Sequence, residues 1–276
     1  MKKLKFKYKM DLKFSSPVTG HYFALRCVPG DSPCQEIRLS KCEISPADSL
    51  THLTDGFGNR KISGACMGPH STFGYDVEGT ALVEGMKVQK GPLHPVYRFP
   101  SPYTIPGEKV MAFAENAARV CSLEGARTEL EQALTVMRLV YEYMVYDPKA
   151  TDTRTTAEEA LALGRGVCQD YAHIMTAVLR RMEIPARYVT GLMIGEGASH
   201  AWTEVYTDGG WYGLDPTNCL HTDDYYIRIA VGRDFGDCPA DKGCFRGQAR
   251  QEQRVYVNVE DITDDRNSSI NGTSCR

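Results

Sequence analysis

One cysteine, Cys168, lies where a thiol could act as a nucleophile. Gly164 and Gly166 precede it, and apolar residues recur at helical spacing from Tyr171 to Met182. This spacing predicts a helix with Cys168 in its first turn, and the two glycines leave room for a substrate backbone. The free N–H groups and the dipole at a helix start stabilise a thiolate and can bind a developing oxyanion. Most cysteines are small buried hydrophobes, but this position favours a nucleophile.

Two further residues, His200 and Asp215, could activate this thiol. Asp208-Gly209 separates two alternating segments and predicts a two-residue hairpin turn. In that register Trp202 faces Asp215, and His200 is the diagonal neighbour of Asp215, about 7–8 Å away at the backbone. A register shifted by one residue would put His200 and Asp215 on opposite faces. In the first register Asp215 can orient the imidazole, and His200 can take the proton of the thiol.

The N-terminal third of the chain has the pattern of β-structure. Apolar residues alternate with lysines and one aspartate over residues 3–14, which predicts a half-buried strand with its lysines on an exposed face or edge. Further short strands are expected around residues 22–28, 36–39 and 75–84, separated by turn signals such as Asp55-Gly56. We expect this region to form a β-sandwich-like domain.

The remainder has helical patterns and then the hairpin. Apolar residues recur at spacings of three and four over residues 130–144, which predicts a long helix. Thr156 and Glu159 form a capping box that opens a short helix ending near Gly164. The expected domain organisation is a β domain over 1–92, a proline-rich linker over 93–106, a catalytic domain over 107–265 and a flexible tail over 266–276.

The composition is that of an ordinary folded protein. The chain has 276 residues and a formal net charge of -3, which gives no electrostatic drive toward nucleic acid. The basic start is followed by no apolar secretory core, and no run approaches the ~18–20 apolar residues of a membrane span. We therefore expect a cytoplasmic protein that binds neither nucleic acid nor a membrane.

The ten cysteines are scattered along the chain and are expected to be reduced thiols. No pair has the Cys-x-x-Cys spacing of a zinc site. The nearest approaches are Cys66 with His70 and Cys238 with Cys244, and neither has a partner pair. We expect no metal and no cofactor.

Several motifs resemble bacterial transglutaminase-like proteins of the cysteine-protease type. The resemblance extends over most of the chain and includes the N-terminal β region. The motifs are Gly166-Val-Cys-Gln-Asp-Tyr-Ala-His173, Ile184-Pro-Ala-Arg-Tyr-Val-Thr-Gly191, His200-Ala-Trp202, Leu214-Asp-Pro-Thr-Asn218, Phe14-Ser-x-Pro-Val18 and Asp55-x-Phe-Gly-Asn59. The resemblance implies an α+β fold with a papain-like core, in which a helix bearing cysteine packs on an antiparallel sheet bearing histidine and aspartate. The family's Cys-His-Asp triad falls on Cys168, His200 and Asp215.

Several further residues could support this triad. Related folds use a side chain upstream of the nucleophile as an oxyanion donor, which makes Tyr146 the first candidate and Gln169 the second. Asp170 could restrain the start of the helix or shape the cleft. Trp202 and Gly166 are expected to line the substrate cleft, Trp202 being partly core, whereas His173 lies about 140° around the helix from Cys168 and is expected to pack.

Three functions are compatible with these residues. The first is a peptidase or amidase that cleaves peptide or isopeptide amides through a thioester, with a peptide or protein as its partner. The second is a transglutaminase, in which an amine replaces water as the acyl acceptor. The third is a non-catalytic binding module that keeps the fold. The N-terminal domain has two possible roles: it binds the substrate, or it covers the core.

Overall fold

The computed structural model describes residues 1–85 and 88–264, and its longest strand, β1 (Lys2–Leu25), organises the N-terminal sheet. The apolar residues from Leu4 to Phe14 are buried, and the intervening lysines point to the exposed face, as predicted. The first half of β1 pairs with two strands, and its second half pairs with two others. The partners are β5 (His70–Val83), β16 (Gln251–Asp261), β4 (Arg60–Cys66) and β15 (Asp241–Arg246).

Shorter strands extend this sheet to eight. They are β2 (Gln35–Ser45) on β5, β3 (Ser49–Thr54) on β4, and β10 (Gly195–Gly197) on β16. The pairing of β1 changes register between Lys13 and Val18 on its β5 side, and beyond this irregularity β1 pairs with β4 instead. The two halves then pack against each other, since the rings of Phe23 and Phe73 lie 4.6 Å apart at their centroids. The arrangement resembles a β-sandwich.

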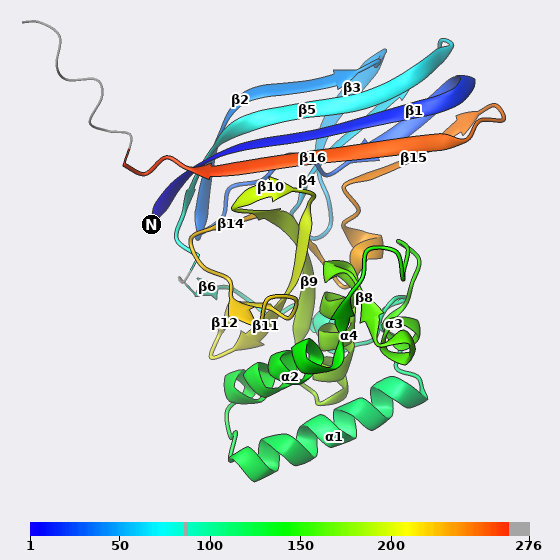
Figure 1. Ribbon diagram of the computed structural model, residues 1–276. Coiled ribbons are helices and arrows are strands. Elements are labelled where there is room, and N and C mark those ends of the chain that lie inside the picture. Colours follow the sequence, from blue (N-terminus) through cyan, green and yellow to red (C-terminus); the bar gives the residue numbers. More distant parts are fainter. Residues whose placement is uncertain (86–87, 265–276) are drawn as a thin grey trace, which may run out of the picture.

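The last two described strands, β15 and β16, lie in this N-terminal sheet (Figure 1). The residues of β15 and β16 fall within the catalytic domain that the sequence predicts over 107–265. In the structure β16 instead pairs with β1, and Leu4 lies opposite Asp261. The chain therefore returns to its starting sheet after forming the second region. The predicted tail over 266–276 lies outside the described residues.

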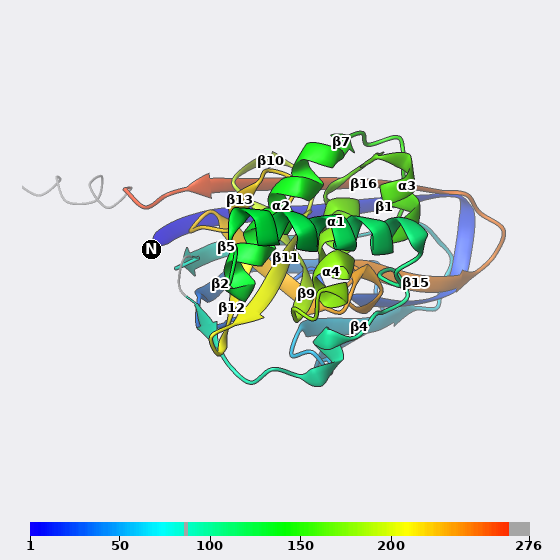
Figure 2. The same cartoon turned by 90° about the horizontal axis from the view of Figure 1, so that it is seen from below.

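Helices cover one side of the second region. They are α1 (Glu108–Glu124), α2 (Glu129–Tyr143), α3 (Ala157–Leu163) and α4 (Cys168–Arg181). The capping box at Thr156 and the left-handed Gly164 bound α3 as predicted. The sequence did not predict α1, which lies on the outside of the other three (Figure 2). The linker contains a short 3-10 helix at Pro95–Arg98 and a turn in which the Thr104 N–H donates to the Ser101 carbonyl at 2.7 Å.

A second, antiparallel sheet lies between the helices and the N-terminal sheet (Figure 1). Its strands are β13 (Leu220–His221), β12 (Gly210–Asp215), β11 (His200–Thr207), β9 (Ala186–Met193) and β14 (Tyr226–Gly232), in that order, with β6 (Gln89–Lys90) beside β12. The β11–β12 hairpin has the predicted register, with Thr207 opposite Gly210. Helix α4 packs on β11, where the Thr203 hydroxyl donates to the Ala172 carbonyl at 3.1 Å.

Two very short elements and one short helix complete the fold. Strands β7 (Val145–Tyr146) and β8 (Arg165–Gly166) pair in parallel just before α4, and a 3-10 helix spans Phe235–Asp237. No helix in the described ranges is both long and apolar enough to cross a membrane.

Candidate active site

Cys168 is the first residue of α4, as its glycine-flanked position predicts. Its side chain is partly buried and packs against the core shared by the two sheets. Asp170 holds this helix start, because its Oδ2 accepts hydrogen bonds from the Val167 N–H at 2.8 Å and from the Thr151 hydroxyl at 2.6 Å. The burial of Asp170 raises the pKa of its carboxyl. Asp170 therefore restrains the backbone before the thiol, as one of its two predicted roles requires.

His200 lies between the thiol and a buried carboxylate. Its Nε2 is 2.7 Å from Oδ2 of Asp215, and Asp215 is fully buried. His200 also interacts with the side chain of Cys168, and this interaction contributes to its pKa. Burial lowers the pKa of His200, but the hydrogen bonds to Asp215 and Cys168 outweigh it and raise that pKa to about 10. The three side chains thus form one chain of contacts.

Asp215 is held by more groups than the sequence indicated. Its Oδ2 also accepts from the Tyr226 hydroxyl at 2.9 Å and the Asn218 amide at 2.8 Å, while Oδ1 accepts from the Thr217 N–H at 2.9 Å. Burial opposes ionisation, yet these donors and His200 together lower the pKa of the carboxyl. Asp215 is therefore an anion with a fixed orientation. Asn218 belongs to a motif quoted from the sequence, but no local pattern points to Tyr226.

The candidate oxyanion donors are both close to the helix start. Tyr146 pairs with Gly166 across β7 and β8, and its side chain is half exposed. Partial burial raises the pKa of Tyr146, and so does the charge of Cys168, which places the phenol within electrostatic reach of the thiol. Gln169 is buried in the first turn of α4. The structure thus brings Tyr146 toward Cys168 across the β7–β8 pair.

Local structure explains why the two positions before Cys168, 164 and 166, are glycines. Gly164 adopts a left-handed conformation with φ 66° and ends α3. A Cβ on Gly166 would lie 2.4 Å from Oδ2 of Asp170. The space that a side chain at Gly166 would need is therefore occupied by the carboxylate of Asp170. Contact between Gly166 and a substrate stays a prediction.

Trp202 is a core residue next to the site. It is buried, and its ring centroid lies 6.4 Å from His200 and 5.5 Å from Tyr226. Its Nε1 has no hydrogen-bond partner among the described residues. Trp202 thus packs behind the imidazole and limits its movement.

His173 packs in the core, as its position on α4 predicts. It is fully buried between the rings of Tyr103 and Tyr188, and its Nε2 accepts from the Phe235 N–H at 3.1 Å. Burial, with a smaller effect of Arg180, lowers the pKa of His173 to about 3. A neutral His173 can serve as a fixed acceptor.

Within residues 1–85 and 88–264, no group of three or more His, Cys, Asp or Glu side chains is arranged to hold a metal. Cys66 and His70 do meet, with Sγ 3.4 Å from Nδ1. His21 contacts the opposite nitrogen of His70 at 3.2 Å. The imidazole of His70 therefore lies between Cys66 and His21, and its two ring nitrogens face different partners.

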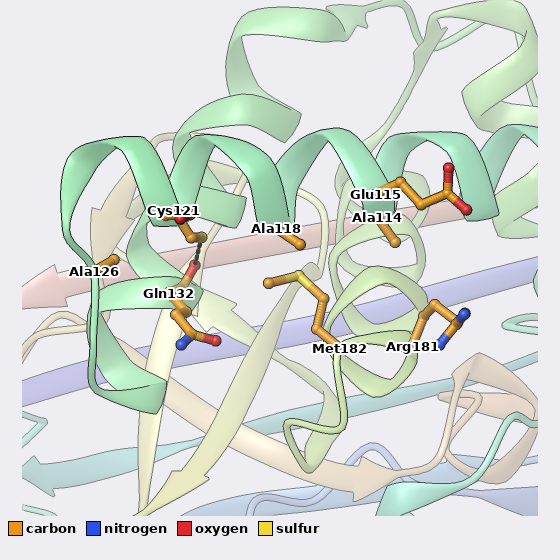
Figure 3. Close-up of a pocket in the computed structure, with 9 residues that line it drawn as sticks. Ala114, Glu115, Ala118, Cys121, Ala126, Gln132, Arg181 and Met182 are labelled. Atoms are coloured by element: carbon orange, nitrogen blue, oxygen red, sulfur yellow. Dashed lines mark hydrogen bonds between the residues drawn. The ribbon is translucent and has the colours of Figure 1, made fainter.

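A cavity of about 450 Å³ lies between α1, the start of α2 and the far end of α4 (Figure 3). Arg181 and Met182 line it together with Cys121 and two alanines of α1, Ala114 and Ala118. Cys168 begins α4 and Arg181 ends it, so at 1.5 Å per residue the two are about 20 Å apart. This cavity is separate from the thiol.

The raised pKa of His200 predicts a pH-dependent stability. Because the pKa rises from 6.5 to about 10 in the folded protein, the stabilising charge is fully present below 6.5 and is lost as the pH rises through about 10. The free energy of unfolding of the wild type should therefore exceed that of His200→Gln most at about pH 6, and the difference should shrink toward about pH 10. Urea unfolding of both proteins measures it, and a constant difference would contradict the charged pair.

Comparison with known proteins gives a consistent family. Residues 117–216 match the model of the transglutaminase-like superfamily, and residues 4–82 match that of the bacterial transglutaminase-like N-terminal region. An uncharacterized protein of Mycobacterium leprae is 28% identical over 89% of this chain and 94% of its own length. One of Mycobacterium tuberculosis is 28% identical over 86% and 85%.

A similar fold has been solved. The crystal structure of a putative cysteine protease from Cytophaga hutchinsonii superposes with a TM-score of 0.75 at 21% identity, covering 95% of this chain and 92% of that one. At this identity the likeness shows the fold. It includes both the N-terminal sheet and the helical region, because nearly all of each chain is matched.

Proposed function

Because the chain belongs to the transglutaminase-like superfamily, we propose that it is a cysteine-dependent enzyme that hydrolyses peptide or isopeptide amides. The observation that carries the proposal is the position of His200, which is hydrogen-bonded to Asp215 on one side and to Cys168 on the other. A nucleophile, a base and an orienting acid in contact are what acyl transfer requires. A cytoplasmic location and a peptide or protein substrate are further predictions from the sequence.

In the proposed reaction the Cys168 thiolate attacks the amide carbon and forms a C–S bond. The carbonyl oxygen becomes an oxyanion, which the N–H groups at the start of α4 stabilise. His200, as an imidazolium, gives its proton to the leaving amine when the C–N bond breaks. Water then attacks the thioester carbon and gives one proton to His200. The C–S bond breaks, the carboxylic acid leaves, and the Cys168 thiolate and the His200 imidazolium are restored. Asp215 keeps the imidazole oriented through both steps.

Hydrolysis is favoured over transfer to an amine by the exposure around the thiol. Transfer requires that water is kept from the thioester. The Cys168 side chain is only partly buried, and Tyr146 beside it is 56% exposed. These exposures support access of water to a thioester on Cys168.

The proposal is tested by the mass of glutamine-containing peptides incubated with the full-length protein, with and without a primary amine. Hydrolysis gives cleaved or deamidated peptides in both cases. Incorporation of the amine without hydrolysis would assign the protein to the transferases. No change of any peptide, together with an unreactive Cys168, would indicate a binding module that keeps the fold.

Tyr146→Phe should slow turnover if the phenol donates to the oxyanion. Removal of one such donor typically lowers kcat by about 10²–10³-fold. The substitution keeps the ring and should leave the alkylation rate of Cys168 nearly unchanged, because alkylation forms no oxyanion. Gln169→Ala is the comparison for the second candidate. If Gln169→Ala lowers kcat more than Tyr146→Phe does, the assignment of the donor is wrong.

A further inference from the structure

Another cavity, which is polar, lies between the N-terminal region and the second sheet. Its volume is about 240 Å³, somewhat below the ~300–1,000 Å³ of pockets for drug-sized ligands. Three arginines, Arg60, Arg187 and Arg228, line it together with Gln89 and Asp31. The cavity does not include the thiol or its partners. Glu204, beneath its inner end, is four residues from His200 on β11, or about 13 Å along the strand.

The inner end of this cavity holds two arginines that share one carboxylate. Arg187 Nε donates to Oε2 of Glu204 at 2.6 Å, and its Nη2 donates to the side-chain Oε1 of Gln89 at 3.0 Å. Arg228 Nη1 donates to the same Gln89 oxygen and lies 3.7 Å from Oε1 of Glu204. The side chains of Arg187, Glu204 and Arg228 are only 8%, 11% and 19% exposed. Among the described residues, the two guanidinium groups therefore share the single carboxylate of Glu204.

Among the described residues, the charges that line the cavity sum to one excess positive charge. At the mouth, Arg60 Nη2 pairs with Oδ2 of Asp31 at 2.7 Å, and both side chains are exposed. Glu204 offsets one of the two inner arginines. Burial lowers the pKa of Arg228 and the neighbouring Arg187 lowers it further, and together they outweigh the opposite effect of the shared Glu204, so the second charge is only partly compensated in this cavity. An anion would relieve it.

The unused donors of Arg228 have the geometry that a carboxylate requires. Within the described residues, neither its Nε nor its Nη2 makes a hydrogen bond. These two atoms form one edge of the guanidinium, and such an edge binds two carboxylate oxygens in parallel. Ile229, Val231 and Phe57 give the same cavity an apolar wall. We propose that this cavity is a binding site for a small monocarboxylate with a short apolar body. The single excess charge matches a monoanion better than a phosphate.

The test uses the full-length protein and two probes, acetate and N-acetylalanine, with chloride keeping the ionic strength constant. Arg187 lies over the ring of Trp211 at 4.1 Å, so binding should change the tryptophan emission in a saturable way. The melting temperature should also rise, by about 3 °C at ten times Kd. N-acetylalanine should bind more tightly than acetate because it also contacts the apolar wall. Cys168→Ala should bind both probes as the wild type does, which separates this site from the proposed catalysis.

Two substitutions locate the site. Arg228→Gln should weaken binding by about tenfold or more, since it removes a charge-assisted pair of hydrogen bonds. The matched control is Arg38→Gln, which removes the same charge from an exposed side chain outside the cavity. If Arg228→Gln does not fold, Arg60→Gln at the mouth replaces it and should raise Kd by about threefold, because the Arg60–Asp31 pair is partly screened by solvent.

Three results would overturn the proposal. The first is no saturable change with either probe in the wild type. The second is unchanged binding in Arg228→Gln, or in Arg60→Gln where that variant replaces it. The third is inorganic phosphate binding as tightly as N-acetylalanine at the same ionic strength, which would contradict the match to a monoanion.

Discussion

Replacing Cys168 by alanine is expected to abolish acyl transfer, with a loss of about 10⁴–10⁶-fold in kcat. The reason is that no second nucleophile contacts His200 among the described residues. The wild type, treated with p-nitrophenyl acetate, should release one p-nitrophenolate per protein in a burst and carry one acetyl group on the peptide that contains Cys168.

The matched control is Cys244→Ala, which removes an exposed cysteine from β15 in the N-terminal sheet. This variant should keep the full burst. Equal bursts from Cys168→Ala and the wild type would show that another thiol reacts, and the proposed nucleophile would then be wrong. Cys168→Ser places a hydroxyl of nearly the same size where the thiol was. Its comparison with Cys168→Ala separates loss of the thiol from loss of packing.

Asp215→Asn should have the next largest effect, a loss of about 10³–10⁴-fold in kcat. The carboxylate accepts from His200, Tyr226 and Asn218 on one oxygen, and an amide cannot accept on its nitrogen. The imidazole would then take the wrong tautomer, or the buried donors would lose their partner. The pH profile of kcat should also lose the limb that reports the raised pKa of His200.

Tyr226→Phe is the control for this substitution. It removes one donor to Asp215 and leaves the carboxylate and its bond to His200 in place. A loss of about tenfold or less in kcat is expected, because Asn218 and the Thr217 N–H still hold the carboxylate. If Asp215→Asn costs no more than Tyr226→Phe, Asp215 does not orient the base.

The parts of the fold that follow from neighbouring residues could be predicted. The Asp208-Gly209 turn determines the register of β11 and β12, and the turn needs no distant contact. The same holds for the start of α4 and for the capping box of α3, whose signals lie within a few residues. These local elements place Cys168, His200 and Asp215.

The missed elements depend on weak or distant signals. Helix α1 buries mainly small residues, among them Ala114 and Ala117, so its apolar pattern is faint in the sequence. Strand β16 pairs with β1 across almost the whole chain, and no local pattern names its partner. Likewise Tyr226 reaches Asp215 from β14, which is separated from β12 in the sheet by β11 and β9, and Arg187 meets Arg228 between two strands. Only the tertiary fold brings such pairs together.

The most direct test of the proposed triad is alkylation by iodoacetamide at about pH 6, with peptide mapping of the wild type and of His200→Ala. Ordinary thiols, with a pKa near ~8.5, are mostly protonated there, so rapid alkylation reports an activated thiolate. We expect Cys168 to react first in the wild type, and His200→Ala to slow it by about tenfold or more. If Cys168 reacts no faster than the exposed Cys244 in the wild type, the thiol of Cys168 is not activated. That result would contradict the proposed catalytic triad.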